Sequence, residues 1–543
     1  MPPAQTFDHP IEPLLYSSKK AAESAGAELA VVASEDRWND FGFSILAHFG
    51  FRLGLSERML WLDGKLAVRG ESNLRRLAAK LLEGGKTSAP LKDAHEPYAA
   101  LLTDLKSYSA LRMELGLDLA RQRLAALHDV AMLRDVGQPV PNWTDFFSSK
   151  VYVHSMIRSS EAYLAAKDGA GVLVRNGRSE VDVRVPFEAR LTGLPPRLSF
   201  SFRFERRALR GRIAVLVGKN GLGKTTSLAK LAQALVDRDY RHARIDPRPD
   251  VNQVLAFAHS TSLSQFVRRS NASSARVRAF SLDSRKRSRK VAELLTAMLP
   301  EIARGFDERG SRLHSLSQIL EAEFPWLVLA VPVNDGGRIE IAGKGRFDDL
   351  HVWSDNIGEQ TRLDAILRLD MNREIEFVDS QHKSRKLSLG QYAFVRFVLI
   401  ALANAGPGSV IVVDEPENFL HPNLISRFMR VLNHVLNDAR SIAIVATHSP
   451  FVVREVQAEQ VHILANSGEG VVVTSPRMQT LGANVASISD EVFGDDLHEH
   501  LYEELLNSED FRGASISELV EHYAGELSVE ALMLLRSKLE KAG

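Results

Sequence analysis

Apolar residues in the middle and later parts of the chain follow two patterns that alternate. Short continuous apolar runs end at loops and predict buried strands, whereas apolar residues three or four positions apart predict helices. The strands predicted in this way are 213–217, 409–413 and 441–446, and the helices are 227–236, 391–405 and 422–437. Because strands and helices that alternate along a chain indicate a parallel sheet covered by helices, we predict an α/β fold.

The regions on either side and in the middle depart from this alternation. Helical spacing of apolar residues over 98–108 and 111–130 predicts a mostly helical N-terminal region, for which the sequence indicates no function. A second helical stretch interrupts the α/β region, and the tail is predicted to be helical and is acidic at its start. The predicted divisions are an N-terminal region 1–150, a first α/β part 151–281, a helical insertion 282–325, a second α/β part 326–480 and a tail 481–543.

Aromatic residues and glycines gather early in the N-terminal region, and Gly137–Pro141 has the composition of a linker. The aromatic residues predict a small core, and the alternative is a surface on which a ligand stacks. They are Trp38, Phe41, Phe43, Phe49 and Phe51.

Composition narrows the class of protein. A chain of 543 residues is too long for one ordinary core, so we expect two or three domains. Hydrophobic residues at 45% and charged residues at 25% are typical of a soluble globular protein, and no apolar run reaches the ~20 residues of a membrane span. The absence of cysteine excludes disulfides, cysteine-ligated zinc and a thiol nucleophile. With an N-terminus that does not resemble a secretion signal, this fits a cytoplasmic protein.

The glycine-rich stretch 218–226, GKNGLGKTT, carries the clearest chemistry. It follows a predicted strand and opens a predicted helix, so its backbone N–H groups and the helix dipole form a cradle for a phosphate group. Lys224 is expected to reach the β- and γ-phosphates, and the Thr225 hydroxyl is expected to hold Mg²⁺. The other residues expected to contact the nucleotide are Gly218, Asn220, Gly221, Gly223 and Thr226. The alternative is a glycine-rich turn that binds nothing.

Two further strands end in residues that suit the same chemistry. The strand 410–413 leads into Asp414 and Glu415, which we expect to orient Mg²⁺ and to polarise the attacking water respectively. The strand 441–446 leads into His448, which is placed to sense the γ-phosphate. The alternative roles are a helix-capping acid before Pro416 and a structural histidine.

The pentapeptide Leu387–Gln391, LSLGQ, precedes a predicted helix and offers a second anion site through Ser388, Gly390 and Gln391. This pentapeptide resembles the signature of the ATP-binding-cassette (ABC) superfamily, and the glycine loop, signature, acidic strand and histidine occur in that family's order. The resemblance implies a phosphate-loop NTPase head with an antiparallel β lobe, with ATP and Mg²⁺ as cofactors. It also implies a homodimer, or a higher oligomer, in which the signature of one subunit closes on the ATP of another.

Other segments resemble one branch of that superfamily. Residues 416–422, PENFLHP, and 447–450, THSP, are similar to OLD-family and SMC-like ATPases, many of them bacterial anti-phage defence proteins. Residues 481–494 resemble the tail of the Septu-system ATPase subunit. The acids of a Toprim nuclease are not evident after residue 450, so the resemblance implies a separate effector nuclease as partner. The glutamine that relatives place near Mg²⁺ is not obvious, and Gln265 is the candidate.

Local charge points to a further partner. Two basic clusters predict either a solvated face or a sequence-independent contact with the phosphate backbone of DNA or RNA. The first contains Arg268, Arg269, Arg276, Arg278, Arg285, Lys286, Arg287, Arg289 and Lys290, and the second contains Lys383, Arg385 and Lys386.

The sequence therefore predicts a cytoplasmic, Mg²⁺-dependent ATPase that dimerises on ATP and gates a partner acting on nucleic acid, as in anti-phage defence. Two alternatives stay open. One is a transporter-associated cassette, against which the sequence after Glu415 and the large N-terminal region argue. The other is a regulatory scaffold that binds ATP with little turnover.

Overall fold

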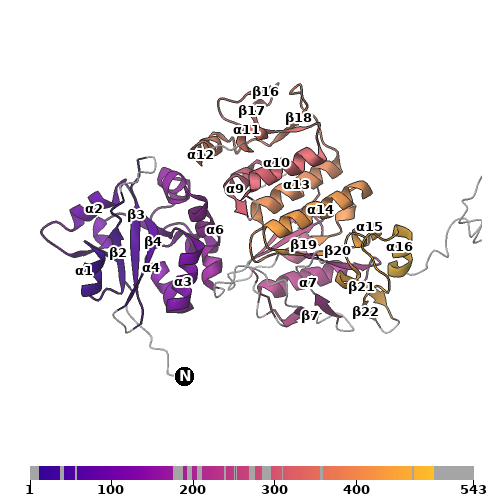
Figure 1. The fold of residues 1–543 in the computed structure, drawn as a ribbon, viewed down its shortest axis with the longest axis horizontal. Helices are drawn as coiled ribbons and strands as arrows, with labels where there is room; N and C mark the ends of the chain where they lie inside the picture. The colour runs from indigo at the N-terminus through magenta and orange to yellow at the C-terminus, as the bar shows by residue number, and fades with distance from the viewer. Residues whose placement is uncertain are drawn as a thin grey trace, which may run out of the picture.

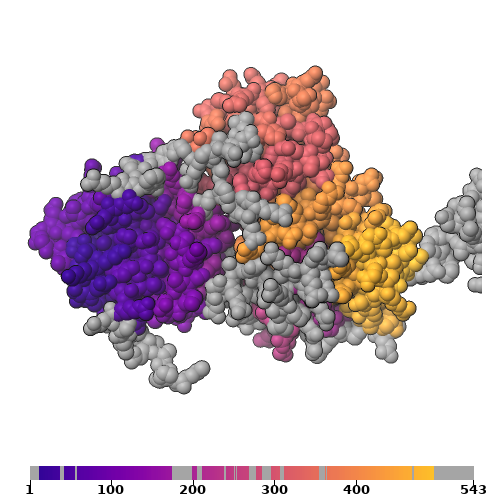
Figure 2. All heavy atoms as spheres, in the orientation of Figure 1, coloured from indigo at the N-terminus to yellow at the C-terminus, as the bar shows by residue number. Residues whose placement is uncertain are grey.

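The computed structural model places two units side by side, an N-terminal unit and a larger unit that follows it in the chain (Figure 1). In the space-filling view, the indigo and purple atoms of the first form a lobe of their own (Figure 2). The structure describes residues 11–36, 42–54, 58–174, 187–191, 198–202, 204, 211–237, 240–246, 248–249, 251, 253–267, 276–283, 295–307, 310–354, 359–467 and 470–493.

The N-terminal unit is built on a six-stranded sheet, with strand order β5-β1-β2-β3-β4-β6. Its strands are β1 Leu14–Tyr16, β2 Leu29–Ala33, β3 Leu46–Arg52, β4 Met59–Val68, β5 Ser88–Pro90 and β6 Tyr98–Leu102. Its helices are α1 Lys19–Ser24, α2 Leu74–Leu81, α3 Leu105–Leu115, α4 Leu117–Ala126, α5 Val130–Val136 and α6 Ser160–Val174. The prediction of a mostly helical region over 1–150 was therefore wrong.

The error has a physical cause in short apolar runs that suit either a buried strand or a buried helix. Tyr98–Leu102 was assigned to a helix, yet it pairs with β4 as an edge strand, and the helix α3 begins only at Leu105. Phe49 and Phe51 lie fully buried in the core of this unit, as the core interpretation of the aromatic stretch expects. That core extends to Leu173, beyond the predicted end of the region.

The larger unit is organised around a seven-stranded sheet, with strand order β12-β11-β19-β20-β9-β21-β22. Its strands are β9 Ile213–Gly218, β11 Gln253–Ala258, β12 Arg276–Ser281, β19 Ser409–Asp414, β20 Ile442–Thr447, β21 Val461–Asn466 and β22 Val471–Thr474. All neighbouring strands are parallel except β21 and β22, which confirms the predicted α/β fold. The antiparallel lobe consists of β7 Phe187–Leu191, β8 Leu198–Phe202 and β10 Ala243–Asp246.

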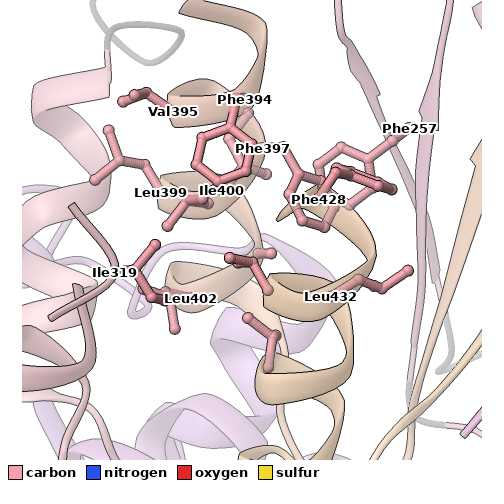
Figure 3. Packing of buried hydrophobic residues seen from close by; sticks show 14 of the residues in the cluster. Phe257, Ile319, Phe394, Val395, Phe397, Leu399, Ile400, Leu402, Phe428 and Leu432 are labelled. Atoms are coloured by element: carbon pink, nitrogen blue, oxygen red, sulfur yellow. The ribbon is translucent and has the colours of Figure 1, made fainter. Parts of the chain in front are cut away.

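Helices cover the seven-stranded sheet. They are α7 Lys224–Val236, α8 Leu263–Phe266, α13 Leu389–Asn404, α14 Pro422–Asp438, α15 Pro450–Val453 and α16 Val485–Phe493. The buried side chains of α7 and α8 belong to one core, and those of α13, α14, α15 and α16 belong to the largest core. Helix α13 is the centre of this core: Phe397 from α13 meets Phe257 from β11 and Phe428 from α14 (Figure 3). The predicted tail is helical as far as Phe493, and its remainder lies outside the described residues.

The segment between β12 and α13 contains more than the predicted helices. Helices α9 Leu299–Arg304 and α10 Arg312–Glu323 are present, with the short hairpin β13 Phe306–Asp307 and β14 Gly310–Ser311 between them. A separate four-stranded antiparallel sheet follows, with β15 Val328–Pro332, β16 Ile339–Ile341, β17 Gly345–Asp349 and β18 Glu376–Val378, and helices α11 Leu350–Ser354 and α12 Glu359–Arg368. Strands β15 and β18 therefore belong to this small sheet and not to the parallel one.

The N-terminal unit contacts the C-terminal end of helix α13. Lys167 on α6 is half-buried and donates a hydrogen bond to the Ala403 carbonyl oxygen at 2.8 Å. The same Nζ lies 3.3 Å from a carboxylate oxygen of Glu301 on α9, and Tyr163 on α6 donates to that carboxylate. Burial lowers the pKa of Lys167 to about 7. These contacts fix α6 against both α9 and α13.

Candidate nucleotide site

The order of the strands brings the predicted site residues to one edge of the sheet. Strand β20 lies between β19 and β9, and all three run in the same direction. Asp414 therefore lies level with Ala446, and Thr447 lies level with Val217. The glycine loop, the acidic pair and His448 all follow these strand ends, so the parallel register is what assembles the site.

Three glycines shape the loop between β9 and α7. Gly221 and Gly223 have φ angles of 84° and 83°, in the left-handed region that side chains disfavour. Gly218 is extended, and a Cβ atom at this position would lie 2.6 Å from the Leu464 carbonyl oxygen of the neighbouring strand β21. Helix α7 then begins at Lys224 and points its free N–H groups towards the loop, as an anion cradle requires.

These glycines make a testable pair of substitutions. Gly218→Ala should lower the free energy of unfolding by about 1–3 kcal/mol, because the new methyl group meets backbone that cannot move without separating β9 from β21. Gly221→Ala is the control: it has nothing within 4 Å and only its left-handed backbone to strain, so about 1 kcal/mol is expected. Denaturant unfolding of the two variants measures the difference, and equal losses would contradict the crowding at Gly218.

Lys224 is buried against the loop that it is expected to serve. Its Nζ donates to the carbonyl oxygens of Gly218 at 2.8 Å and Lys219 at 3.0 Å, and it lies 3.7 Å from Glu415 Oε1. Asn220 Oδ1 is a further acceptor, at 3.4 Å. Burial lowers the pKa of Lys224, and the negative charge of Glu415 opposes that shift. The ammonium group thus bonds to oxygen atoms of the loop and lies near Glu415, and phosphate oxygens can replace the loop acceptors.

Oxygen atoms suited to Mg²⁺ meet at Asp414. The Thr225 hydroxyl donates to Asp414 Oδ1 at 2.9 Å, and the Ser262 hydroxyl lies 3.3 Å from Asp414 Oδ2 as a second donor. Burial raises the pKa of Asp414 to about 6, and the hydrogen bond from Thr225 counteracts part of that rise. A carboxylate flanked by hydroxyls is a hard oxygen set of the kind that Mg²⁺ prefers, so these residues fit the ion.

Gln265 is not at this position in the structure. Its side chain is exposed on the short helix α8, while Ser262, just before that helix, contacts Asp414. The neighbouring His259 stacks on Phe419, in the loop that follows the acidic pair, with ring centroids 5.6 Å apart. The sequence analysis did not identify Ser262, although a polar residue soon after the end of β11 was the available signal.

Glu415 and His448 face each other across the site. Glu415 has a φ angle of 48°, and its backbone N–H bonds to Ala446, which holds the strained residue at the strand end. Its Oε1 lies 3.7 Å from His448 Nδ1, and its Oε2 accepts a hydrogen bond from Asn418 at 2.8 Å. The carboxylate is therefore oriented and partly exposed, as a group that takes a proton from water must be.

Glu417 is a second acid that the sequence analysis did not single out. Its Oε1 accepts hydrogen bonds from the Thr447 hydroxyl and the His448 backbone N–H, both at 2.6 Å. The same oxygen lies 3.1 Å from His448 Nδ1. This Nδ1 atom is buried and forms no hydrogen bond among the described residues, so the bonded contact between Glu417 and His448 is the one to the backbone N–H. Glu417 is thus placed to orient the histidine.

The signature residues lie at the exposed N-terminus of α13. Ser388 and Gln391 form a capping box: the Gln391 N–H donates to Ser388 Oγ, and the Ser388 N–H donates to Gln391 Oε1. Since Ser388 uses its oxygen only as an acceptor here, its O–H proton is available for another partner. Leu389 next to it is 63% exposed, although it is apolar. Gly390 allows the helix start to approach the loop after Glu415, because a Cβ atom would lie 3.0 Å from the Phe419 carbonyl oxygen.

Within one chain, the signature and the glycine loop do not touch. Among the described residues, Ser388, Gly390 and Gln391 form no hydrogen bond or ion pair with residues 218–226. Thr226 lies in the first turn of α7, half-buried. The structure therefore brings together Lys224, Thr225, Asp414, Glu415 and His448, and it leaves the signature facing outwards.

The basic clusters are only partly described. Arg268, Arg269, Arg285, Lys286, Arg287, Arg289 and Lys290 lie outside the described residues. Arg278 on β12 is exposed, bonds to Asn404 and lies over the ring of Phe280. Near the signature, Arg385 pairs with Asp379 at 2.7 Å, while Lys383 and Lys386 are exposed. No helix within the described residues is long and apolar enough to cross a membrane.

Comparison with known proteins agrees with this geometry. Residues 213–454 match the family model described as "AAA domain, putative AbiEii toxin, Type IV TA system". Protein ea59 of Escherichia phage lambda is 30% identical over 164 residues, which make up 30% of this chain. The matched stretch spans about a third of that relative, at 31% of its length.

Two classes represented among the solved structures with distant likeness are SMC heads and parts of ABC transporters. An SMC head bound to the C-winged helix domain of ScpA has a TM-score of 0.28 at 9% identity, covering 53% of this chain and 96% of its own. The SMC head domain from Thermotoga maritima has a TM-score of 0.26 at 11% identity, covering 54% and 99%. The protein cbiO1 from Clostridium perfringens, part of an ABC transporter complex, has a TM-score of 0.26 at 14% identity, covering 62% and 100%. Likenesses this distant do not distinguish between the two classes.

The assignment rests on three agreeing observations: the parallel sheet, the glycine loop with its acidic partner strand, and the family match over the same residues. Together they place a phosphate-loop nucleotide-binding fold at residues 213–454, the stretch that matches the AAA family model.

Proposed function

We propose that this protein hydrolyses ATP with Mg²⁺, dimerises on ATP, and thereby gates a partner that acts on nucleic acid. One observation carries the proposal. Lys224, Asp414 and Glu415 converge at one sheet edge, while Ser388 is exposed with its hydroxyl proton available. A site that lacks its signature within one chain is completed when a second copy supplies that signature.

Each residue has a distinct task in this proposal. The loop N–H groups and Lys224 bind the β- and γ-phosphates, and Thr225 and Asp414 hold Mg²⁺, which supplies charge neutralisation at the transferring phosphoryl group. Glu415 accepts the proton of the attacking water. His448, oriented by Glu417 at 3.1 Å, donates a hydrogen bond to the γ-phosphate. Ser388 and Gly390 of the second subunit close over the same phosphate.

Two comparisons support a role in defence. The matching family model is described as a putative AbiEii toxin, and a phage protein shares part of the sequence. We propose on this basis that the ATPase serves a toxin or anti-phage system in the cytoplasm. Its partner there is an effector nuclease, and DNA or RNA contact is through phosphates, without sequence preference.

Phosphate release and molecular mass test the ATPase and the dimer together. Purified full-length protein is expected to release phosphate from ATP only with Mg²⁺, to lose that activity with a chelator, and to regain it when Mg²⁺ is added back. Light scattering should show a monomer without nucleotide and a dimer with ATP. Binding of ATP with neither turnover nor a change in mass would contradict the proposal and favour the scaffold.

A further inference from the structure

A cavity lies between the N-terminal unit and helix α9, apart from the glycine loop. Its volume is about 550 Å³, which is within the range of small-molecule sites. Residues 137–139 of the N-terminal unit form an exposed part of its wall, and Glu301 and Arg304 come from α9. Because both units supply walls, a molecule bound here contacts both of them.

Two arginines in this cavity share a single carboxylate, Glu301, among the described residues that line it. Arg134 donates to the Tyr152 hydroxyl at 2.9 Å, and Arg304 lies over the ring of Tyr163 at 5.5 Å. Among the described residues, neither guanidinium forms an ion pair with a carboxylate. The Arg304 Nε atom is buried without a hydrogen-bond partner, which is costly for a charged group.

The one acid that lines the cavity does not balance both arginines. The negative charge of Glu301 acts on Arg134 and Arg304, but the same carboxylate also accepts from Tyr163 and lies 3.3 Å from the Lys167 ammonium, so three cationic groups share one carboxylate. The two guanidinium groups therefore favour an anion. Since a guanidinium fork matches phosphate oxygens in pairs, a phosphoryl group is the anion that they suit best.

Aromatic rings form the other side of the cavity. Phe147 and Tyr152 pack edge to face with ring centroids 5.2 Å apart, and Tyr163 adds a third ring. Such walls suit a flat aromatic group, which stacks on or against the rings. We propose that this cavity binds a nucleotide, with its phosphate on Arg134 and Arg304 and its base against Phe147 and Tyr152.

This site is separate from the ATP site, and its test does not depend on hydrolysis. The Lys224→Ala substitution removes most phosphate binding at the glycine loop. The full-length protein with this substitution is titrated by calorimetry with AMP, adenosine and inorganic phosphate. AMP is expected to bind at least tenfold more tightly than either of the other probes. Adenosine tests the base alone, and inorganic phosphate tests the anion alone.

Substitutions then locate the binding. Arg134→Gln and Arg304→Gln should each weaken AMP about tenfold, as the loss of one charged hydrogen-bonding group does. Arg76→Gln, on an exposed position of the same unit, is the control and should change nothing. Phe147→Leu keeps an apolar wall and should weaken AMP while leaving phosphate binding unchanged.

Several outcomes would overturn the proposal. One is AMP binding that disappears with Lys224→Ala, and another is AMP binding that neither arginine substitution affects. Equal affinity for AMP and inorganic phosphate would mean an anion site that does not recognise a nucleotide. If the Lys224→Ala protein does not fold, wild-type protein is titrated with AMP instead. A second AMP site that Arg304→Gln weakens supports the proposal, and the absence of such a site overturns it.

Discussion

Replacing Glu415 by glutamine should leave ATP binding intact and reduce hydrolysis by a factor of about 10²–10⁴. Glutamine has the same shape, and its carbonyl oxygen can still accept the hydrogen bond that Asn418 gives to Oε2 at 2.8 Å. What it loses is the ability to take a proton from water. The variant should therefore form the ATP-bound dimer and fail to leave it. Phosphate release and light scattering in the presence of ATP measure the two effects.

Two companion variants sharpen this result. Glu340→Gln, exposed on β16, is the control and should keep wild-type turnover. Glu417→Gln should cause a smaller loss, because Glu417 acts through the orientation of His448. Wild-type turnover in Glu415→Gln would remove Glu415 from its role as the base.

Mixing two inactive variants should restore activity if the site is shared between subunits. Lys224→Ala removes the phosphate contact of the loop, and Ser388→Arg blocks closure of the signature, so each homodimer is expected to have lost hydrolysis. In a mixed dimer, one site combines the intact Lys224 of one subunit with the intact Ser388 of the other. About a quarter of wild-type turnover is expected, since random pairing makes half of the dimers mixed and each has one good site.

The control for the mixing experiment is a pair of variants from the same half of the site. Lys224→Ala mixed with Glu415→Gln should stay inactive, because Lys224 and Glu415 lie 3.7 Å apart in one chain and no mixed site contains both intact. Recovery with this pair, or its absence with Lys224→Ala and Ser388→Arg, would contradict a composite site. Size-exclusion chromatography of the mixture verifies that the subunits exchange.

The fold of the ATPase domain could be predicted from the sequence because its strands are long apolar runs that end in conspicuous residues. Val410–Val413 and Ile442–Ala446 are buried on both faces, so their direction and neighbours follow from the α/β pattern. Once the strands are parallel, Asp414 and Thr447 must lie at the same edge as Gly218. The proposed chemical roles of these residues stay predictions until the variants are measured.

What could not be predicted depends on contacts between distant segments. Ser262 and Glu417 matter because of what they bond, and neither belongs to a recognisable spacing. The N-terminal sheet was missed for a different reason: its strands are short or interrupted by glycine, as at Gly50 and Gly64. A Cβ atom at Gly64 would lie 2.7 Å from the Leu101 carbonyl oxygen, so close strand pairing requires these glycines.

Helix α13 is a rigid connection between the signature and the N-terminal unit. It has 16 residues, and at the rise of an α-helix it is about 24 Å long. Its first turn carries the exposed Ser388, and its last turn is held by Lys167 of the N-terminal unit. Its middle is packed on all sides by aromatic and aliphatic side chains, so it has to move as a rigid body. A displacement of the signature by a second subunit would therefore also move the other end of α13, where Lys167 joins it to the N-terminal unit.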